Sequence, residues 1–190
     1  MKRLLGLILA VALPLAAHAQ TPAALIDDYA KAHDFSGAVL VAKDGKIRHD
    51  RRYGEANRAF HVANGERTKY WIASITKAFT AVLVLQFVEQ GRIALDGKIA
   101  DYFPDYAGDG AHKITIHQLL NHTSGLPNFD QVKDFETALR SGLPTYQTPY
   151  TPEQLVAKFC SGALVNAPGS TFDYNNGDYI VLGRILERVA

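Results

Sequence analysis

Residues 71–90 constrain the fold more than any other stretch, because they are predicted to form a long helix with apolar side chains around nearly its whole circumference. A helix that is apolar on all sides belongs in the interior of a domain. Gly91 follows it and can take the left-handed conformation that ends many helices. We therefore expect a folded core around this helix and expect the helix to be buried. Its apolar positions are Ile75, Phe79, Val82, Leu83, Val84, Leu85, Phe87 and Val88.

The N-terminal residues resemble a secretory signal peptide. Two basic residues precede an apolar run over residues 4–15, and small alanines stand at positions 17 and 19, where a signal peptidase requires them. The run is well short of the roughly 20 residues that span a bilayer. We predict a signal peptide over residues 1–19, export to the periplasm or the exterior of a bacterial cell, and no membrane span after cleavage. The alternative is a buried N-terminal helix.

Charge and cysteine content exclude several classes of protein. Removal of residues 1–19 takes away two of the 20 basic residues, which leaves 18 against 19 acidic ones. This balance does not indicate a nucleic-acid partner or an anionic membrane surface. Cys160 is the only cysteine, so an intramolecular disulfide and a multi-cysteine metal site are both excluded. We expect Cys160 to be a packed thiol on a helix rather than a nucleophile.

Two histidines and two acidic residues are considered as metal ligands or catalytic acids, and none is assigned such a role. His117 and His122 are five residues apart, so they do not share a helix face and make poor joint metal ligands. We interpret both as structural. Glu66 and Asp173 are interpreted as solvated or capping residues rather than catalytic acids.

The other elements follow from turn and cap signals. Residues 21–31 are predicted to form an amphipathic helix, and Asp44-Gly45 between residues 37–43 and 46–53 is typical of a β-hairpin. Residues 51–69 lack periodicity and are predicted to form a loop. Residues 92–106 are predicted to be irregular.

Two later helices are predicted from capping boxes, in which Thr115 pairs with Gln118 and Thr151 with Gln154. A last amphipathic helix is predicted over residues 179–189. One hairpin beside about five helices is an imbalance, because an isolated hairpin is marginal on its own. Either the helices cover a very small sheet or further strands are missing.

The sequence Ser74-Ile-Thr-Lys77 places a hydroxyl and an amine on one helix face. The helix start favours negative charge near Ser74, and apolar neighbours favour a lowered pKa of the Lys77 amine. A serine nucleophile needs such a nearby base. However, a Ser-x-x-Lys match arises by chance roughly once in a chain of this length. A solvated lysine beside an N-terminal serine is the alternative.

Four motifs occur in a particular order along the chain. After residues 74–77 come residues 91–96 (Gly-Arg-Ile-Ala-Leu-Asp), 119–126 (Leu-Leu-Asn-His-Thr-Ser-Gly-Leu) and 167–176 (Ala-Pro-Gly-Ser-Thr-Phe-Asp-Tyr-Asn-Asn). In these motifs the chain resembles the serine β-lactamase-related superfamily, on the side of class C β-lactamases, penicillin-binding proteins and esterases. The resemblance covers nearly all of the expected mature chain. It implies an α+β fold of the β-lactamase/transpeptidase type, with a helical region packed on an antiparallel sheet.

The resemblance also implies roles for individual residues. Ser74 matches the acylated nucleophile and Lys77 its proton-transfer partner. Tyr174 matches a general acid/base, and Asn176 matches the residue that orients Lys77 and binds substrate. Without the resemblance, residues 174–176 indicate only a turn with a half-buried aromatic side chain. The implied substrates are β-lactams, peptidoglycan-derived peptides or esters, and no metal or organic cofactor is implied.

The resemblance further implies a third motif, Lys-Thr-Gly or His-x-Gly, on a strand that supplies part of the oxyanion hole. No such motif occurs before Ala190. We therefore expect residues 20–190 to be the N-terminal portion of a single serine hydrolase domain whose C-terminal strands are absent, so that the activity of this chain alone stays open. The alternatives are a non-catalytic cell-wall or peptide-binding protein that retains the pocket, and a product without a stable fold.

Overall fold

The computed structural model describes residues 21–132 and 134–190. The chain divides after Trp71 into two compact units, which are described separately. The predicted signal peptide, residues 1–19, lies outside the described residues. Among the described residues, no helix combines the length and the apolar content that crossing a bilayer requires.

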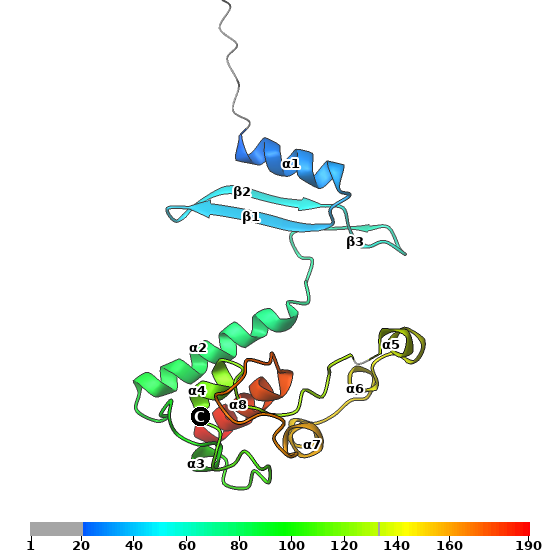
Figure 1. The fold of residues 1–190 in the computed structure, drawn as a ribbon. Helices are drawn as coiled ribbons and strands as arrows, with labels where there is room; N and C mark the ends of the chain where they lie inside the picture. Colours follow the sequence, from blue (N-terminus) through cyan, green and yellow to red (C-terminus); the bar gives the residue numbers. More distant parts are fainter. Residues whose placement is uncertain (1–20, 133) are drawn as a thin grey trace, which may run out of the picture. The chain divides into compact units, whose positions relative to one another are not determined.

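In the described part of the first unit, residues 21–71, the chain forms one helix and two hairpins. Helix α1 (Pro22–Ala32) begins at Thr21, whose hydroxyl accepts a hydrogen bond from the Ala24 N–H at 3.2 Å. Strands β1 (Gly37–Lys43) and β2 (Lys46–Tyr53) pair antiparallel, and α1 lies beside them (Figure 1). Asp44 and Gly45 both have positive φ, 53° and 70°, as a type I′ turn requires. The helix and the hairpin predicted from the sequence are confirmed.

The predicted loop over residues 51–69 is partly wrong, because it contains a second small hairpin. Strands β3 (Glu55–Asn57) and β4 (Val62–Ala63) pair antiparallel. With three and two residues, both strands are too short to give an alternating hydrophobic pattern. Gly54 turns the chain between β2 and β3 at φ 59°, where an added Cβ would collide with Ser36.

The second unit begins with the predicted apolar helix, and here one expectation is wrong. A short 3₁₀ turn, η1 (Ala73–Ile75), leads into α2 (Thr76–Glu89), and Gly91 ends it at φ 70° as predicted. However, Val84 is the one α2 residue that is fully buried, whereas Phe79 is 62% exposed. The described elements cover only one side of α2. Because apolar residues are spread around the whole helix, its other sides present apolar side chains that no described element covers.

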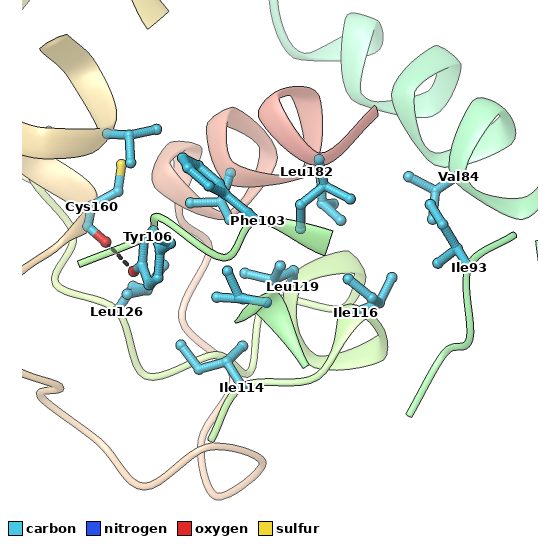
Figure 2. Close-up of a cluster of buried hydrophobic side chains, with 14 residues drawn as sticks. Val84, Ile93, Phe103, Tyr106, Ile114, Ile116, Leu119, Leu126, Cys160 and Leu182 are labelled. Atoms are coloured by element: carbon cyan, nitrogen blue, oxygen red, sulfur yellow. Dashed lines mark hydrogen bonds between the residues drawn. The ribbon is translucent and has the colours of Figure 1, made fainter. Parts of the chain in front are cut away.

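The core of the second unit lies between α2, α4 and α8. Helix α8 (Asn176–Val189) contacts α2 and α4 (Ile116–Leu120), and the short helix α3 (Ile99–Tyr102) packs against it as well. Figure 2 shows side chains from these elements converging on one cluster. The fully or almost fully buried apolar residues are Val84, Ile93, Ile99, Phe103, Tyr106, Ile114, Ile116, Leu119, Leu126, Val156, Cys160, Val181, Leu182 and Ile185.

Both predicted capping boxes are present. The Gln118 N–H donates to the Thr115 hydroxyl at 3.1 Å, and the Gln118 side chain accepts from the Thr115 N–H at 2.9 Å. The same reciprocal pair joins Thr151 and Gln154 at the start of α7 (Pro152–Leu155). Each cap satisfies N–H groups that a helix start otherwise leaves without partners.

A π-helical turn, η2 (Val156–Cys160), follows α7 and carries the single cysteine. Cys160 is buried, and burial raises the pKa of its thiol to about 12. Its backbone carbonyl accepts a hydrogen bond from Tyr106 (Figure 2). The expectation of a packed thiol is therefore confirmed.

One helix begins earlier than predicted, and three short helices were not predicted. Helix α8 begins at Asn176, three residues earlier than predicted, because Asn175 caps it by accepting from the Gly177 N–H at 2.8 Å. The region predicted to be irregular contains α3. Between α4 and α7 the chain also forms two short helices, α5 (Phe135–Ser141) and α6 (Pro144–Gln147).

Candidate active site

Ser74 lies in the 3₁₀ turn η1 and Lys77 in the first turn of α2, three residues further on. The Lys77 ammonium donates a hydrogen bond to the Ser74 hydroxyl oxygen over 3.1 Å. Ser74 is exposed, whereas Lys77 is half-buried. Ala73, directly before Ser74, has φ 44°, a left-handed conformation that residues with a Cβ rarely adopt. Such strain is typical of functional sites that a surrounding structure holds in place.

Tyr174 approaches the same hydroxyl from the segment before α8. Its phenol donates to the Ser74 oxygen over 2.6 Å. The Lys77 ammonium lies 4.8 Å from the centre of the Tyr174 ring. Hydrogen bonds with Lys77 and then with Ser74 lower the pKa of Tyr174, because both stabilise its phenolate form. Ser74 is therefore contacted by two groups that can exchange protons.

Asn176 joins this group through both ends of its amide. Its side-chain oxygen accepts from Lys77, and its NH₂ group donates to the Asp130 carboxylate. The same NH₂ group lies 3.2 Å from the Tyr146 hydroxyl, which in turn donates to Asp130 over 2.5 Å. A carboxylate accepts hydrogen bonds and donates none. The Asp130 carboxylate therefore holds the NH₂ end of the Asn176 amide, and the amide oxygen faces Lys77.

The sequence did not point to Asp130 or Tyr146. They lie 46 and 30 residues before Asn176 in the chain, in a segment without apolar periodicity. A carboxylate followed sixteen residues later by a tyrosine is no recognisable motif. Only the fold brings these two side chains to Asn176.

Asn175, between the site residues Tyr174 and Asn176, is buried and holds their backbone. Its NH₂ group donates to the carbonyl oxygens of Leu126 and Pro127 at 3.0 and 3.2 Å. The Asn128 side chain donates to the Tyr174 carbonyl over 2.8 Å. Successive residues thus point in different directions: Tyr174 and Asn176 to the Ser74 hydroxyl and Lys77, and Asn175 into the unit.

A second polar cluster lies behind Tyr174. The His122 Nδ1 atom is 3.0 Å from a carboxyl oxygen of Asp178, and the Ser124 hydroxyl donates to the other oxygen over 2.5 Å. Burial raises the pKa of Asp178 to about 7, although the hydrogen bond from Ser124 opposes this. Burial also lowers the pKa of His122. Asp178, which lies outside the four motifs, was not singled out from the sequence, and Ser124, which lies within residues 119–126, was assigned no role there.

The other candidates lie apart from this group. Glu66 is exposed in the first unit, and His117 is exposed on α4. Asp173 is half-buried, and its backbone N–H donates to the His122 carbonyl at 2.8 Å. Across the described ranges, no group of three or more His, Cys, Asp or Glu side chains is arranged to hold a metal ion.

Comparison with known proteins gives a consistent match. Residues 22–190 match the family model described as Beta-lactamase. Protein flp of Staphylococcus aureus (strain COL) is 32% identical over 166 residues, which are 85% of this chain and 31% of that protein. The penicillin-binding protein from Bacillus halodurans is 32% identical, with a TM-score of 0.70 over 86% of this chain and 48% of that one.

A class C β-lactamase in complex with cefoxitin shares the fold, with a TM-score of 0.66 and 24% identity over 87% of this chain and 42% of that one. The chain thus spans less than half the length of each of these three proteins. These structural matches confirm the β-lactamase/transpeptidase-like fold expected from the motifs. With residues 22–190 matched, the chain belongs to the Beta-lactamase family.

Proposed function

We propose that the protein is an exported serine hydrolase that acts through an acyl-enzyme on Ser74. One observation carries the proposal: the Ser74 hydroxyl oxygen accepts hydrogen bonds from both Lys77 and Tyr174. A serine becomes a nucleophile when a basic group within hydrogen-bond distance takes its proton. Ser74 is also exposed, so a carbonyl compound has access to it.

The proposed reaction has two steps. The Ser74 oxygen attacks the substrate carbonyl carbon while its proton passes to Lys77 or Tyr174, whichever is in its basic form. The leaving group then departs with a proton from the same pair. In the second step water gives a proton to the same pair and attacks the acyl carbonyl carbon. The bond between that carbon and the Ser74 oxygen breaks, Ser74 regains its proton from the pair, and the carboxylic acid product leaves. Asn176 holds the Lys77 ammonium and helps to bind the substrate.

The substrates that we propose are β-lactams, peptidoglycan-derived peptides or esters. Support comes from the relatives, which include a penicillin-binding protein and a class C β-lactamase crystallised with cefoxitin. We further propose that residues 1–19 are a signal peptide and that residues 20–190 belong to one domain of this type. This assignment is supported by a family match that begins at residue 22.

A covalent labelling experiment tests the proposal. The protein is incubated with a fluorescent penicillin and, separately, with a fluorophosphonate, and the adducts are measured by gel fluorescence and intact mass. Circular dichroism first establishes that the sample is folded. We expect label on the native protein and none on Ser74→Ala. Ser141→Ala is the matched control, because Ser141 is an exposed serine at the end of α5.

Three outcomes contradict the proposal. A folded protein that gains no mass with either probe is not a serine acyl hydrolase. Saturable noncovalent binding without an adduct instead identifies a protein that retains the pocket for binding alone. Label that persists in Ser74→Ala would assign the reaction to another residue.

A further inference from the structure

The polar cluster behind Tyr174 is more buried than the site that it adjoins. Asp178 is fully buried, Ser124 is 2% exposed and His122 is 8% exposed. A buried charge is costly unless it is paired, and buried polar groups require hydrogen-bond partners. The proton positions in this cluster are therefore constrained by its donors and acceptors.

The Ser124 hydroxyl fixes one end of the Asp178 carboxyl group. Its oxygen accepts from the Leu126 N–H over 3.0 Å, so its own hydrogen is available to the Asp178 oxygen Oδ1 at 2.5 Å. Oδ1 is consequently an acceptor. Any proton on the Asp178 carboxyl belongs on the other oxygen, Oδ2, which faces His122.

The His122 ring fixes the other end. The backbone N–H of Asn175 points at His122 Nδ1 over 3.2 Å, and Asp178 Oδ2 lies 3.0 Å from the same atom. A backbone N–H can only donate, so Nδ1 must be an acceptor and carries no proton. The short contact between Nδ1 and Oδ2 then needs its proton on Oδ2.

The ionised alternatives do not satisfy these contacts. A proton on Nδ1 would let His122 donate to an Asp178 carboxylate, but it would also face the Asn175 N–H and leave that buried donor without an acceptor. Among the described residues, no lysine or arginine forms an ion pair with Asp178. The positive charge of Lys77 lowers the pKa of Asp178, and the negative charge of Asp173 raises it. The other titratable groups that interact electrostatically with Asp178 or the pair are Tyr106, Cys160 and Tyr179.

We propose that Asp178 is a neutral carboxylic acid that donates to unprotonated Nδ1 of His122, and that this pair positions residues 173–175 beside Ser74. Three contacts connect His122 to that segment. Its carbonyl accepts from the Asp173 N–H, its Nδ1 accepts from the Asn175 N–H, and its ring centre lies 4.6 Å from that of Tyr174. His122 makes them from a left-handed conformation, φ 59°.

The consequence for acylation rests on the proposed function, whereas the position of the proton does not. Asp178 and His122 do not touch Ser74, so they act as positioning residues. Their effect passes through Tyr174, whose hydroxyl must stay within hydrogen-bond distance of Ser74. A displacement of about 1 Å in such a group costs on the order of a hundredfold in rate.

Two substitutions at one position separate the neutral acid from a carboxylate. Asp178→Asn reproduces the neutral pattern, because its NH₂ group donates to His122 and its oxygen accepts from Ser124. We expect Asp178→Asn to keep the rate of Ser74 labelling within about threefold and Asp178→Leu to lose about a hundredfold. If Asp178 acts as a carboxylate, Asp178→Asn falls to the level of Asp178→Leu, which overturns the proposal. Asp109→Asn, at an exposed acid, is the matched control.

The pH profile adds a readout that loss of packing alone would not change. Because the pKa of Asp178 is raised to about 7 and that of His122 is lowered, the neutral pair is intact between the pKa of His122 and about pH 7, and is lost as the pH rises above 7. We expect the labelling rate of the native protein to fall above about pH 7. Asp178→Asn should lack this fall, since it has no proton to lose. An identical fall in Asp178→Asn would contradict the proposed role of the pair.

Infrared spectroscopy detects the proton without any activity. The difference spectrum of native protein minus Asp178→Asn at pH 5 should contain the carbonyl stretch of a protonated carboxylic acid, and that of native minus Asp109→Asn should not. A carboxylate band in its place overturns the proposal even if Ser74 labels normally. If no variant labels but the acid band is present, the proposed function fails and the neutral pair stands.

Discussion

Helices α2 and α8 have the same length and each presents its N-terminal end to the candidate site, yet they differ in how they are stabilised. Helix α8 has its apolar residues on one side and buries Gly177, Asp178, Val181, Leu182 and Ile185. Helix α2 is apolar on all sides and fully buries Val84 alone. A one-sided pattern predicts which face packs, whereas overall hydrophobicity predicts only that a partner is needed.

The two helix starts also differ. Asn175 caps α8 through its side chain, whereas α2 follows a 3₁₀ turn without a side-chain cap. The start of α2 carries Ser74 and Lys77, and the start of α8 carries Asn176 and Asp178. We therefore expect the first turn of α2 to matter for chemistry and the middle of α8 to matter for stability.

Lys77→Arg tests the chemical end of α2 and has the largest expected effect. Arginine keeps the positive charge but cannot act as a base. We expect acylation of Ser74 to fall on the order of a hundredfold or more with the fold retained. The measurement is the rate of probe labelling beside a circular dichroism melt, with Lys113→Arg at an exposed lysine as the control. Normal labelling would remove Lys77 from proton transfer.

Leu182→Ala tests the core face of α8. Leu182 is fully buried, so its truncation should lower the free energy of unfolding by about 2–5 kcal/mol. Leu85→Ala on α2 is the matched control, because it makes the same chemical change at a side chain that is 49% exposed. Denaturant titration of both variants measures the difference. Equal losses would show that the two helices are buried alike.

Asp130→Asn tests how the amide at the start of α8 is oriented. An asparagine can donate as well as accept, so the Asn176 amide is no longer held with its oxygen toward Lys77. Loss of a hydrogen bond to a charged acceptor is worth about 1.5 kcal/mol or more, which predicts about a tenfold slower labelling of Ser74. Tyr150→Phe, at a tyrosine without contact to Asn176, should label at the native rate.

Phe79→Gln tests the exposed side of α2 and has the smallest expected effect. Its ring is 62% exposed, and exposed substitutions usually change stability by no more than about 0.5 kcal/mol. We also expect less self-association at equal concentration, because an exposed apolar patch is reduced. Denaturant titration and light scattering measure the two effects. Destabilisation above about 2 kcal/mol would show that this side of α2 is covered.

Local features were predictable where the responsible residues are close in the chain. The Asp44-Gly45 turn, the Thr115 and Thr151 capping boxes and the stop at Gly91 each depend on a few adjacent residues. The burial of α2 was predicted wrongly because burial depends on the partners that surround a helix. The β3–β4 hairpin was missed because its strands are only three and two residues long.

The candidate site was predictable in part for the same reason. Ser74 and Lys77 are three residues apart, and the motif resemblance supplied Tyr174 and Asn176, whose contact with them spans about a hundred residues. Asp130, Tyr146 and Asp178 could be assigned to the site only once the fold was known, since polar residues of these types occur throughout any chain.

The buried amide of Asn175 has a consequence for how the protein loses activity on heating. Because one side chain holds the backbone on both sides of it, Tyr174 and Asn176 should become disordered together rather than one after the other. Local opening of residues 126–128 would then disable the phenol and the amide in a single event. Inactivation of this kind would precede the melting of α4 and α8, and cooling would reverse it.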